Sequence, residues 1–171
     1  MELWNKINDR KRWQGIVLWI CVAALLVNLL SSLTGNTLNP TATQTYSWLN
    51  MTNIYVLKHG NIIHLLINLN AMLIVAFKMY VKGWKWLCGL GISICYPTRW
   101  ITVPIIGMSG WVYAMLGLMT MSVKSWRWML LVNVLTIAMG AMMPGIAWGM
   151  HAWSYGLGLA ISLAVEPIYK R

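Results

Sequence analysis

Six apolar stretches, separated by more polar connections, run along this chain of 171 residues. An α-helix needs about 20 predominantly apolar residues to cross the hydrocarbon core of a bilayer, and five of the stretches come close to that length. The pattern predicts an all-α polytopic membrane protein with spans at 13–33, 62–81, 84–97, 105–123, 126–143 and 147–168. The stretch at 84–97 is short for a span, and its end near Pro97 and Arg99 is the least sharply marked.

The connection at 34–60 is unusually long for such a small chain and is rich in Thr and Asn. Its large apolar side chains include Trp48, Leu49, Met51, Ile54 and Tyr55. A loop with that content can enter the membrane interface, which would suit gating or substrate binding. A plain outer connector fits the composition equally well.

The composition agrees with lipid as the main solvent. Hydrophobic residues make up 59% of the chain and charged residues 9%, whereas roughly a quarter of a soluble domain is charged. The 12 Trp and 7 Tyr far outnumber the single Phe, and such amphipathic rings gather where a membrane meets water. We therefore expect one membrane domain over 13–171, after a short basic N-terminus at 1–12, with membrane lipid as its surroundings.

The basic residues follow the predicted spans. The net charge of +10 would suggest nucleic acid in a soluble protein, but 11 of the 13 basic residues lie in four clusters at alternate junctions. These are Lys6, Arg10, Lys11 and Arg12; Lys78, Lys82 and Lys85; Lys124 and Arg127; and Lys170 and Arg171. By the positive-inside rule we expect both termini in the cytoplasm, the 34–60 loop outside, and no nucleic-acid partner. The plasma (inner) membrane is the expected location.

Acidic residues are too few to carry carboxylate or metal chemistry. They are Glu2, Asp9 and Glu166, all near the ends of the chain. Without a pair of intramembrane carboxylates, an aspartyl protease and a carboxylate proton relay are excluded. The chain also has no H-E-x-x-H motif, so we expect no metal and no organic cofactor.

Three histidines lie at or near the outer ends of predicted spans: His59, His64 and His151. His64 and Asn68 are four residues apart, which places them on one face of a helix. Polar groups inside a membrane are costly, so they indicate either function or hydrogen bonding between helices. The pair alone does not decide between these interpretations.

The fourth span begins with the sequence Gly107-Met-Ser109-Gly110. Glycines at a helix start allow close approach of the backbone, and the first amides of a helix lack partners within it. Ser109 would therefore suit an exposed nucleophile whose own N–H contributes to an oxyanion site. Tyr113 follows one turn later on the same face. Gly and Ser also mark ordinary tight helix packing in membranes.

The sixth span carries His151 near its outer end, and Ser154 and Gly158 form a face of small residues on the same helix. Such a face would pack closely on the fourth helix, where Gly110 and Gly117 are also small. That packing would bring His151 to Ser109, and a serine needs an adjacent base to become nucleophilic. Because no acidic residue is near, the pair would be a dyad.

In combination, these motifs resemble the rhomboid family of intramembrane serine proteases. The stretch from His59 through His64 to Asn68 resembles the second-helix signature of that family. Gly107-Met-Ser109-Gly110 resembles its nucleophile motif, and His151 with the small residues that follow resembles its sixth-helix motif. The resemblance covers about residues 45–165 and implies a six-helix rhomboid-like bundle.

The resemblance also implies roles. Ser109 would attack the scissile carbonyl and His151 would act as its base, while the Ser109 amide, His64 and Asn68 would stabilise the oxyanion. Supporting roles would belong to His59, Gly107, Gly110, Tyr113, Ser154 and Gly158. The substrate would be the transmembrane segment of another membrane protein.

Two positions depart from the family pattern. The first outer loop of the family usually carries a Trp-Arg pair, where this chain has Trp48-Leu49, and the family's usual glycine three residues after the histidine is Ser154. Two other functions remain open. The chain could be a catalytically inactive rhomboid-like protein that binds single-span clients, or a small transporter, channel or holin-like protein. The latter would be expected to contain an intramembrane charge.

Overall fold

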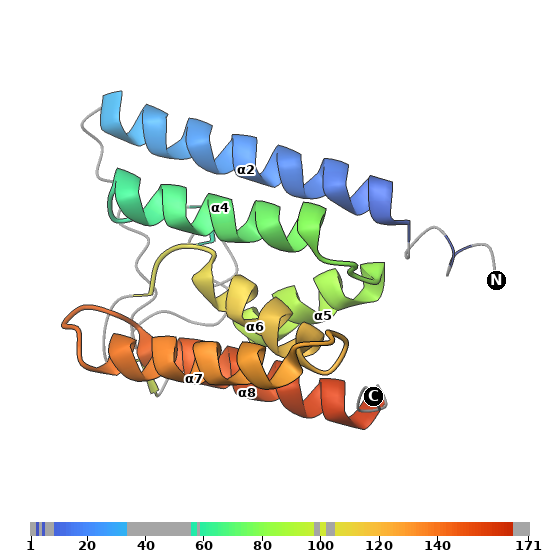
Figure 1. Cartoon of the computed structure of the whole chain (residues 1–171). Coiled ribbons are helices and arrows are strands. Elements are labelled where there is room, and N and C mark those ends of the chain that lie inside the picture. Colours follow the sequence, from blue (N-terminus) through green and yellow to red (C-terminus); the bar gives the residue numbers. More distant parts are fainter. Residues whose placement is uncertain are drawn as a thin grey trace.

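The computed structural model describes residues 3, 5, 9–33, 56–57, 59–97, 100–101 and 105–165. Within these residues the protein is all-helical and contains no strand, which confirms the all-α part of the expected fold class (Figure 1). The six helices are α2 (Arg10–Leu33), α4 (Ile62–Lys78), α5 (Gly83–Ile94), α6 (Ser109–Thr120), α7 (Trp126–Ala141) and α8 (Trp148–Val165). Most of the 34–60 loop, with its apolar side chains and Trp48-Leu49, lies outside the described residues, as does Arg99.

Each helix corresponds to one of the six apolar stretches, but α4, α5, α6 and α7 are shorter than the stretches that predicted them. The helix of the 105–123 stretch begins only at Ser109, because Gly107 adopts a φ of +94° that a right-handed helix does not allow. The helix of the 62–81 stretch ends at Lys78, since Met79 is extended. Among the helices that the structure describes, only α2 is long and apolar enough to cross a membrane, while α4 and α7 are apolar but shorter.

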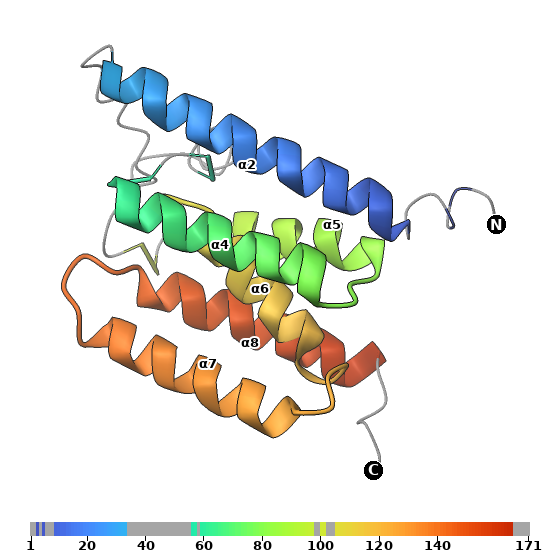
Figure 2. The same cartoon turned by 45° about the horizontal axis from the view of Figure 1, so that its top comes forward.

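Helix α6 lies at the centre of the bundle. It packs along α8 and also contacts α4, α5 and α7, and α2 lies on the outer side of α4 (Figures 1 and 2). Nine of its twelve residues are buried: Gly110, Trp111, Val112, Ala114, Met115, Gly117, Leu118, Met119 and Thr120. A helix that is apolar and buried nearly all round needs neighbours on every side, which explains its central place.

Two glycines allow α6 and α8 to approach each other closely. A methyl group on Gly117 would overlap the carbonyl oxygen of Tyr155 and lie 2.8 Å from the Leu159 nitrogen. A methyl group on Gly158 would lie 2.5 Å from the carbonyl oxygen of Ala114. The backbones of the two helices are therefore in direct contact, and neither position has room for a larger residue.

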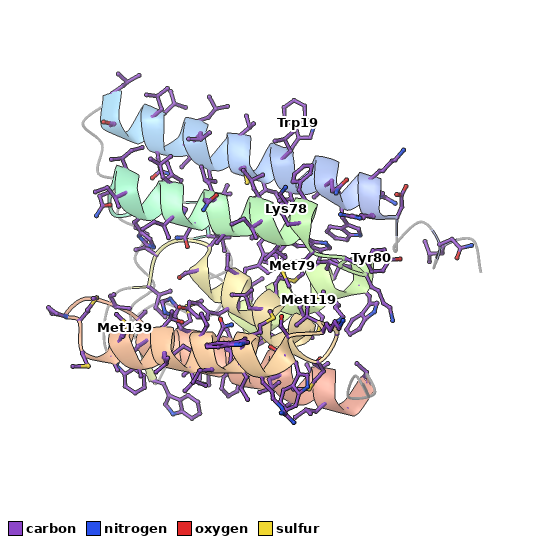
Figure 3. The ribbon with its side chains drawn as sticks, in the orientation of Figure 1. Trp19, Lys78, Met79, Tyr80, Met119 and Met139 are labelled. Atoms are coloured by element: carbon purple, nitrogen blue, oxygen red, sulfur yellow. The ribbon has the colours of Figure 1, made fainter. Side chains whose placement is uncertain are left out.

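The outer faces of the bundle are apolar. Trp19 of α2 is 74% exposed and points away from the other helices in Figure 3. Large apolar side chains are also exposed along α4 and α7, among them Ile63, Ile67, Trp128 and Leu135. Monomeric soluble proteins rarely expose contiguous apolar surface on this scale.

Candidate active site

Ser109 is the first residue of α6. The N-cap residue of α6, Met108, makes no side-chain hydrogen bond to the helix. The backbone amides of the first turn therefore have no side-chain acceptor from the cap. Gly107, two residues earlier, turns the chain into the helix with its positive φ. The serine is half-buried, so its hydroxyl is held in place without being sealed in the core.

His151 lies in the first turn of α8, and its Nε2 is 2.9 Å from Oγ of Ser109. The two residues are 42 positions apart in the sequence, and the close α6–α8 contact brings them together. At this distance the imidazole can accept the hydroxyl proton of the serine.

Tyr113 covers the other side of the imidazole. Its ring stacks on that of His151, with centroids 4.4 Å apart and planes inclined by 20°. The Tyr113 hydroxyl donates a hydrogen bond of 3.4 Å to Oγ1 of Thr136 on α7. The stacked ring restricts rotation of the imidazole, a task that a carboxylate performs in a catalytic triad.

Three polar side chains gather around Gly107. A methyl group there would lie 3.1 Å from Nδ2 of Asn68 and 3.1 Å from ring carbons of His59 and His64. Glycine is favoured here because a φ of +94° strains any other residue, and a Cβ atom would force the three neighbouring side chains to shift. The three side chains therefore meet beside the turn that leads to the candidate nucleophile.

Asn68 has an unpaired donor. The residue is 4% exposed, and its Nδ2 has no hydrogen-bond partner within the described part of the protein. A buried donor without a hydrogen-bond partner lowers the stability of the folded protein by about 1–3 kcal/mol. The presence of such a donor at Asn68 therefore needs an explanation. A transient negative charge beside Gly107 and Ser109 would provide the missing acceptor.

His59 precedes α4 and is held by its backbone and by its ring. The backbone N–H donates to Oδ1 of Asn28 at 3.0 Å, and the ring Nδ1 lies 3.2 Å from the carbonyl oxygen of Leu57. Its ring meets that of His64 edge to face, with centroids 5.0 Å apart. Burial, together with the nearby His64, lowers the pKa of His59 to about 4, although the Leu57 carbonyl opposes this shift. His59 is therefore neutral at neutral pH.

Asn28 also supports the candidate site by holding His59, and its role was not predicted from the sequence. Its Nδ2 donates to the carbonyl oxygens of Ala24 and Leu57, at 2.7 and 2.8 Å, while its Oδ1 receives the His59 N–H. The side chain thus ties α2 to the segment before α4. The available signal was a single Asn within the apolar stretch 13–33, because an amide there needs hydrogen-bond partners.

The small residues of α6 and α8 lie in two different contacts between these helices. Gly158 packs on α6 near Ala114, and Ser154 is fully buried with its Oγ unpaired in the described structure. Gly110 faces the side chain of Met150, with Sδ 3.2 Å from the position of a methyl group, and does not face Ser154 or Gly158. Gly117, rather than Gly110, therefore receives the small face of α8.

No carboxylate or metal site accompanies these residues in the described part of the chain. The one described carboxylate, that of Asp9, accepts hydrogen bonds from the first amides of α2. No group of three or more His, Cys, Asp or Glu side chains that could hold a metal ion occurs among the described residues. The reactive groups that the described site provides are a serine hydroxyl, a histidine imidazole and amide donors.

Comparisons with protein-family models, with curated proteins and with solved structures found no match to this chain.

Proposed function

We propose that this protein is a polytopic intramembrane serine protease of the rhomboid kind. The observation that carries the proposal is the 2.9 Å contact between Nε2 of His151 and Oγ of Ser109. A nucleophile within hydrogen-bond reach of a base, itself oriented by a third group, is the signature of covalent catalysis. Here the third group is Tyr113, stacked on the imidazole.

The mechanism follows from these positions. His151 takes the proton of Ser109 as its Oγ attacks the scissile carbonyl, and the proton then passes to the leaving amine. The resulting acyl-enzyme is hydrolysed by a water molecule that His151 activates in turn. The Ser109 N–H and the Asn68 amide, with His64 beside them, act on the oxyanion. Such preorganised donors are worth about 100- to 1,000-fold in turnover for each donor.

The membrane setting is supported by the apolar exterior and by α2, which is long and apolar enough to cross a bilayer. In an aqueous protein, exposed residues such as Trp19, Ile63 and Trp128 would cause aggregation. In lipid they meet hydrocarbon. The shorter helices then span a thinner apolar layer, which a bilayer accommodates by local thinning.

The orientation is proposed from charge. Arg10 at the start of α2 donates a hydrogen bond to the carbonyl oxygen of Phe77 at the end of α4, so these basic helix ends lie together. The connection from α6 to α7, which contains Lys124, and the start of α7, which contains Arg127, lie at the same end of the bundle (Figure 1). This end would face the cytoplasm by the positive-inside rule. Ser109, at the opposite end of α6, would then open to the outer side.

The substrate class follows from the setting. A transmembrane helix hides its carbonyl groups in hydrogen bonds, so the bond to be cut must first be exposed by local unwinding. We propose transmembrane segments of other membrane proteins as substrates, with helix-weakening Gly or Pro near the cut. The chemistry requires no metal or organic cofactor.

The test is cleavage of a generic single-span substrate by the purified protein in mild detergent. Ser109→Ala and His151→Ala should abolish cleavage, while Ser125→Ala, which changes an exposed serine at the start of α7, should not change it. A fluorophosphonate probe should label the wild type and Ser125→Ala but not Ser109→Ala. Cleavage that survives in Ser109→Ala would contradict the mechanism. A well-folded wild type that neither cleaves nor reacts would instead favour a client-binding, inactive protein.

A further inference from the structure

Asn70 is a polar residue at the centre of an apolar helix. It is the middle residue of the 17-residue helix α4, and its side chain is exposed. At a rise of about 1.5 Å per residue, each end of the helix is roughly 12 Å away. In the proposed membrane setting the amide therefore lies near the middle of the hydrocarbon layer. Lipid tails offer an amide no hydrogen bond, so its exposure there is costly.

Asn70 is also the centre of an exposed apolar stripe. With about 3.6 residues per turn, five large apolar side chains of α4 lie within about 60° of it around the helix axis. They are 44% to 67% exposed and comprise Ile63, Leu66, Ile67, Ile74 and Phe77. Together with Asn70 they form what we call the outer face of α4. The buried residues of α4, Asn68 among them, occupy the other side of the helix, so Asn70 points away from the candidate active site.

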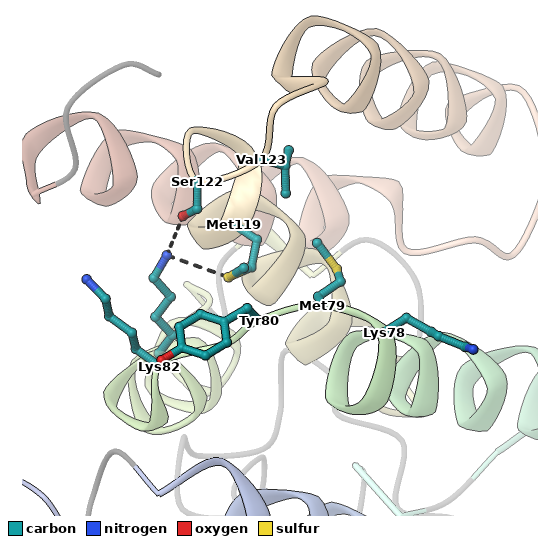
Figure 4. A pocket seen from close by; sticks show the side chains of 8 residues that line it. Lys78, Met79, Tyr80, Lys82, Met119, Ser122 and Val123 are labelled. Atoms are coloured by element: carbon teal, nitrogen blue, oxygen red, sulfur yellow. Dashed lines mark hydrogen bonds between the residues drawn. The ribbon is translucent and has the colours of Figure 1, made fainter. Parts of the chain in front are cut away.

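Other polar side chains of the helices find partners inside the bundle. A cavity of about 270 Å³ opens between the end of α4, the start of α5 and the end of α6 (Figure 4). Lys85 lines it, and its Nζ donates to the carbonyl oxygen of Leu118 at 2.7 Å and to Oγ of Ser122 at 2.8 Å. Asn133 of α7 donates to a carbonyl oxygen of its own helix at 2.7 Å. The side chain of Asn70, in contrast, makes no hydrogen bond with the described part of the chain.

We propose that the outer face of α4 pairs with the same face of a second copy of this chain, with the two Asn70 amides hydrogen-bonded to each other. A carboxamide has both donors and an acceptor, so two of them can exchange a pair of hydrogen bonds. Two copies inserted in the same orientation place Asn70 at the same depth. A two-fold axis along the membrane normal then brings each amide to its own counterpart. The inference rests on the proposed membrane setting and not on protease activity.

The spacing of the outer face suits a pair of parallel helices. Ile63, Asn70 and Phe77 recur every seven residues, and the other members fill the turns between them. Apolar side chains at this spacing interdigitate between two helices, and a single Asn among them fixes the register and the number of partners. Exposed apolar residues alone need no partner in lipid. The amide therefore distinguishes this face from the apolar faces of α2 and α7.

The first test measures association of the full chain in phosphatidylcholine vesicles. Copies that carry donor or acceptor fluorophores are mixed at several protein-to-lipid ratios, and energy transfer gives the dissociation constant of the dimer. The background is Ser109→Ala, so the result does not depend on catalysis. Asn70→Leu should weaken association at least about tenfold, because two hydrogen bonds between helices are lost. Asn70→Gln keeps the amide and should retain most of the association. Leu135→Ala, on the exposed side of α7, is the control and should change it less than twofold.

Crosslinking then locates the contact. Asn70→Cys, with the three native cysteines replaced by alanine, should form a disulfide-linked dimer when copper phenanthroline is added as oxidant, because residues beside a two-fold axis meet their own copies. Trp19→Cys, on the exposed side of α2, should give much less. Equal crosslinking at both positions would show random collision and overturn the proposed pairing.

Three further results separate this proposal from its alternatives. A membrane-embedded monomer at every protein density, or an Asn70→Leu variant that associates like its parent, would overturn the pairing. A monomer with active Ser109 in which Asn70→Leu raises the KM of a single-span substrate would assign the face to a substrate helix instead. Release of the protein from membranes by alkaline carbonate would contradict the membrane setting itself. Because Asn70 is exposed, its variants should fold, and Tm measurements check this.

Discussion

The ring of Tyr113 lies against the imidazole of His151, with centroids 4.4 Å apart and planes 20° from parallel. In the proposed mechanism the Tyr113 ring performs the orienting task that a carboxylate performs in a catalytic triad. Because stacking depends on the ring and not on the hydroxyl, Tyr113→Phe should retain most cleavage. Tyr113→Ala should lower kcat by about 10- to 100-fold, since a base displaced by 1 Å costs on that scale. The measurement is kcat on a single-span substrate. Equal loss in both variants would assign the role to the hydroxyl bond with Thr136 instead.

The unpaired amide of Asn68 leads to a second prediction. Its buried Nδ2, beside Gly107, should donate to the oxyanion only in the transition state, so Asn68→Ala should lower kcat by about 100- to 1,000-fold with little change in KM. Asn70→Ala is the matched control, because Asn70 lies two residues further on α4 and is exposed. Unchanged cleavage by Asn68→Ala would refute the assigned role.

The contact between α6 and α8 should tolerate no added methyl group. Gly158→Ala would place a carbon 2.5 Å from the Ala114 carbonyl oxygen, and backbone cannot move aside cheaply. We expect a loss of about 1–3 kcal/mol in stability and a larger fractional loss of activity, because the helices that hold Ser109 and His151 must separate. Gly156→Ala, with open space around it, should be neutral or stabilising. Thermal unfolding and cleavage measured on both variants test this, and equal Tm values would contradict it.

Asn28 should act on the site through His59. In Asn28→Leu the His59 N–H loses its acceptor and the Leu57 carbonyl loses one of its two contacts, so these bonds no longer tie the segment before α4 to α2. We expect at least a tenfold loss of kcat, in keeping with the displacement of a positioned group. Leu29→Ala, an exposed neighbour on the same helix, is the control. A variant with reduced Tm but full kcat would show that Asn28 has only a structural role.

The lowered pKa of His59 predicts a pH dependence of stability. Its pKa is about 4 in the folded protein, against an ordinary value near 6.5 when unfolded. Between these values the unfolded state binds more protons, so stability is present above about pH 6.5 and is lost as the pH falls toward 4. Tm measured from pH 7.5 to 4.5 should therefore fall, and His59→Gln should reduce the slope. An identical slope in the variant would exclude His59 as the source.

The helices and the small-residue face could be predicted because they depend on local patterns. Each apolar stretch produced one helix, since the burial of apolar side chains is read from neighbouring positions. The helix ends differed where a single backbone conformation intervened, as at Gly107 and Met79. The prediction of which residues pack against the small face of α8 was less accurate. Both glycines face α8, but Gly110 faces the large side chain of Met150, and Gly117 faces the backbone around Gly158. The prediction missed this difference because the crossing point of two helices depends on all their side chains together.

The sequence by itself determined the all-helical architecture, the charge at one end of the bundle and the identity of the candidate dyad. The tertiary structure alone decided the 2.9 Å separation of Ser109 from His151, the anchoring of His59 by Asn28 and the cavity around Lys85. The reason is physical. Helix formation and apolar patterning depend on residues a few positions apart, whereas these contacts join residues 31 to 42 positions apart in the chain. Such contacts exist only once the helices have packed.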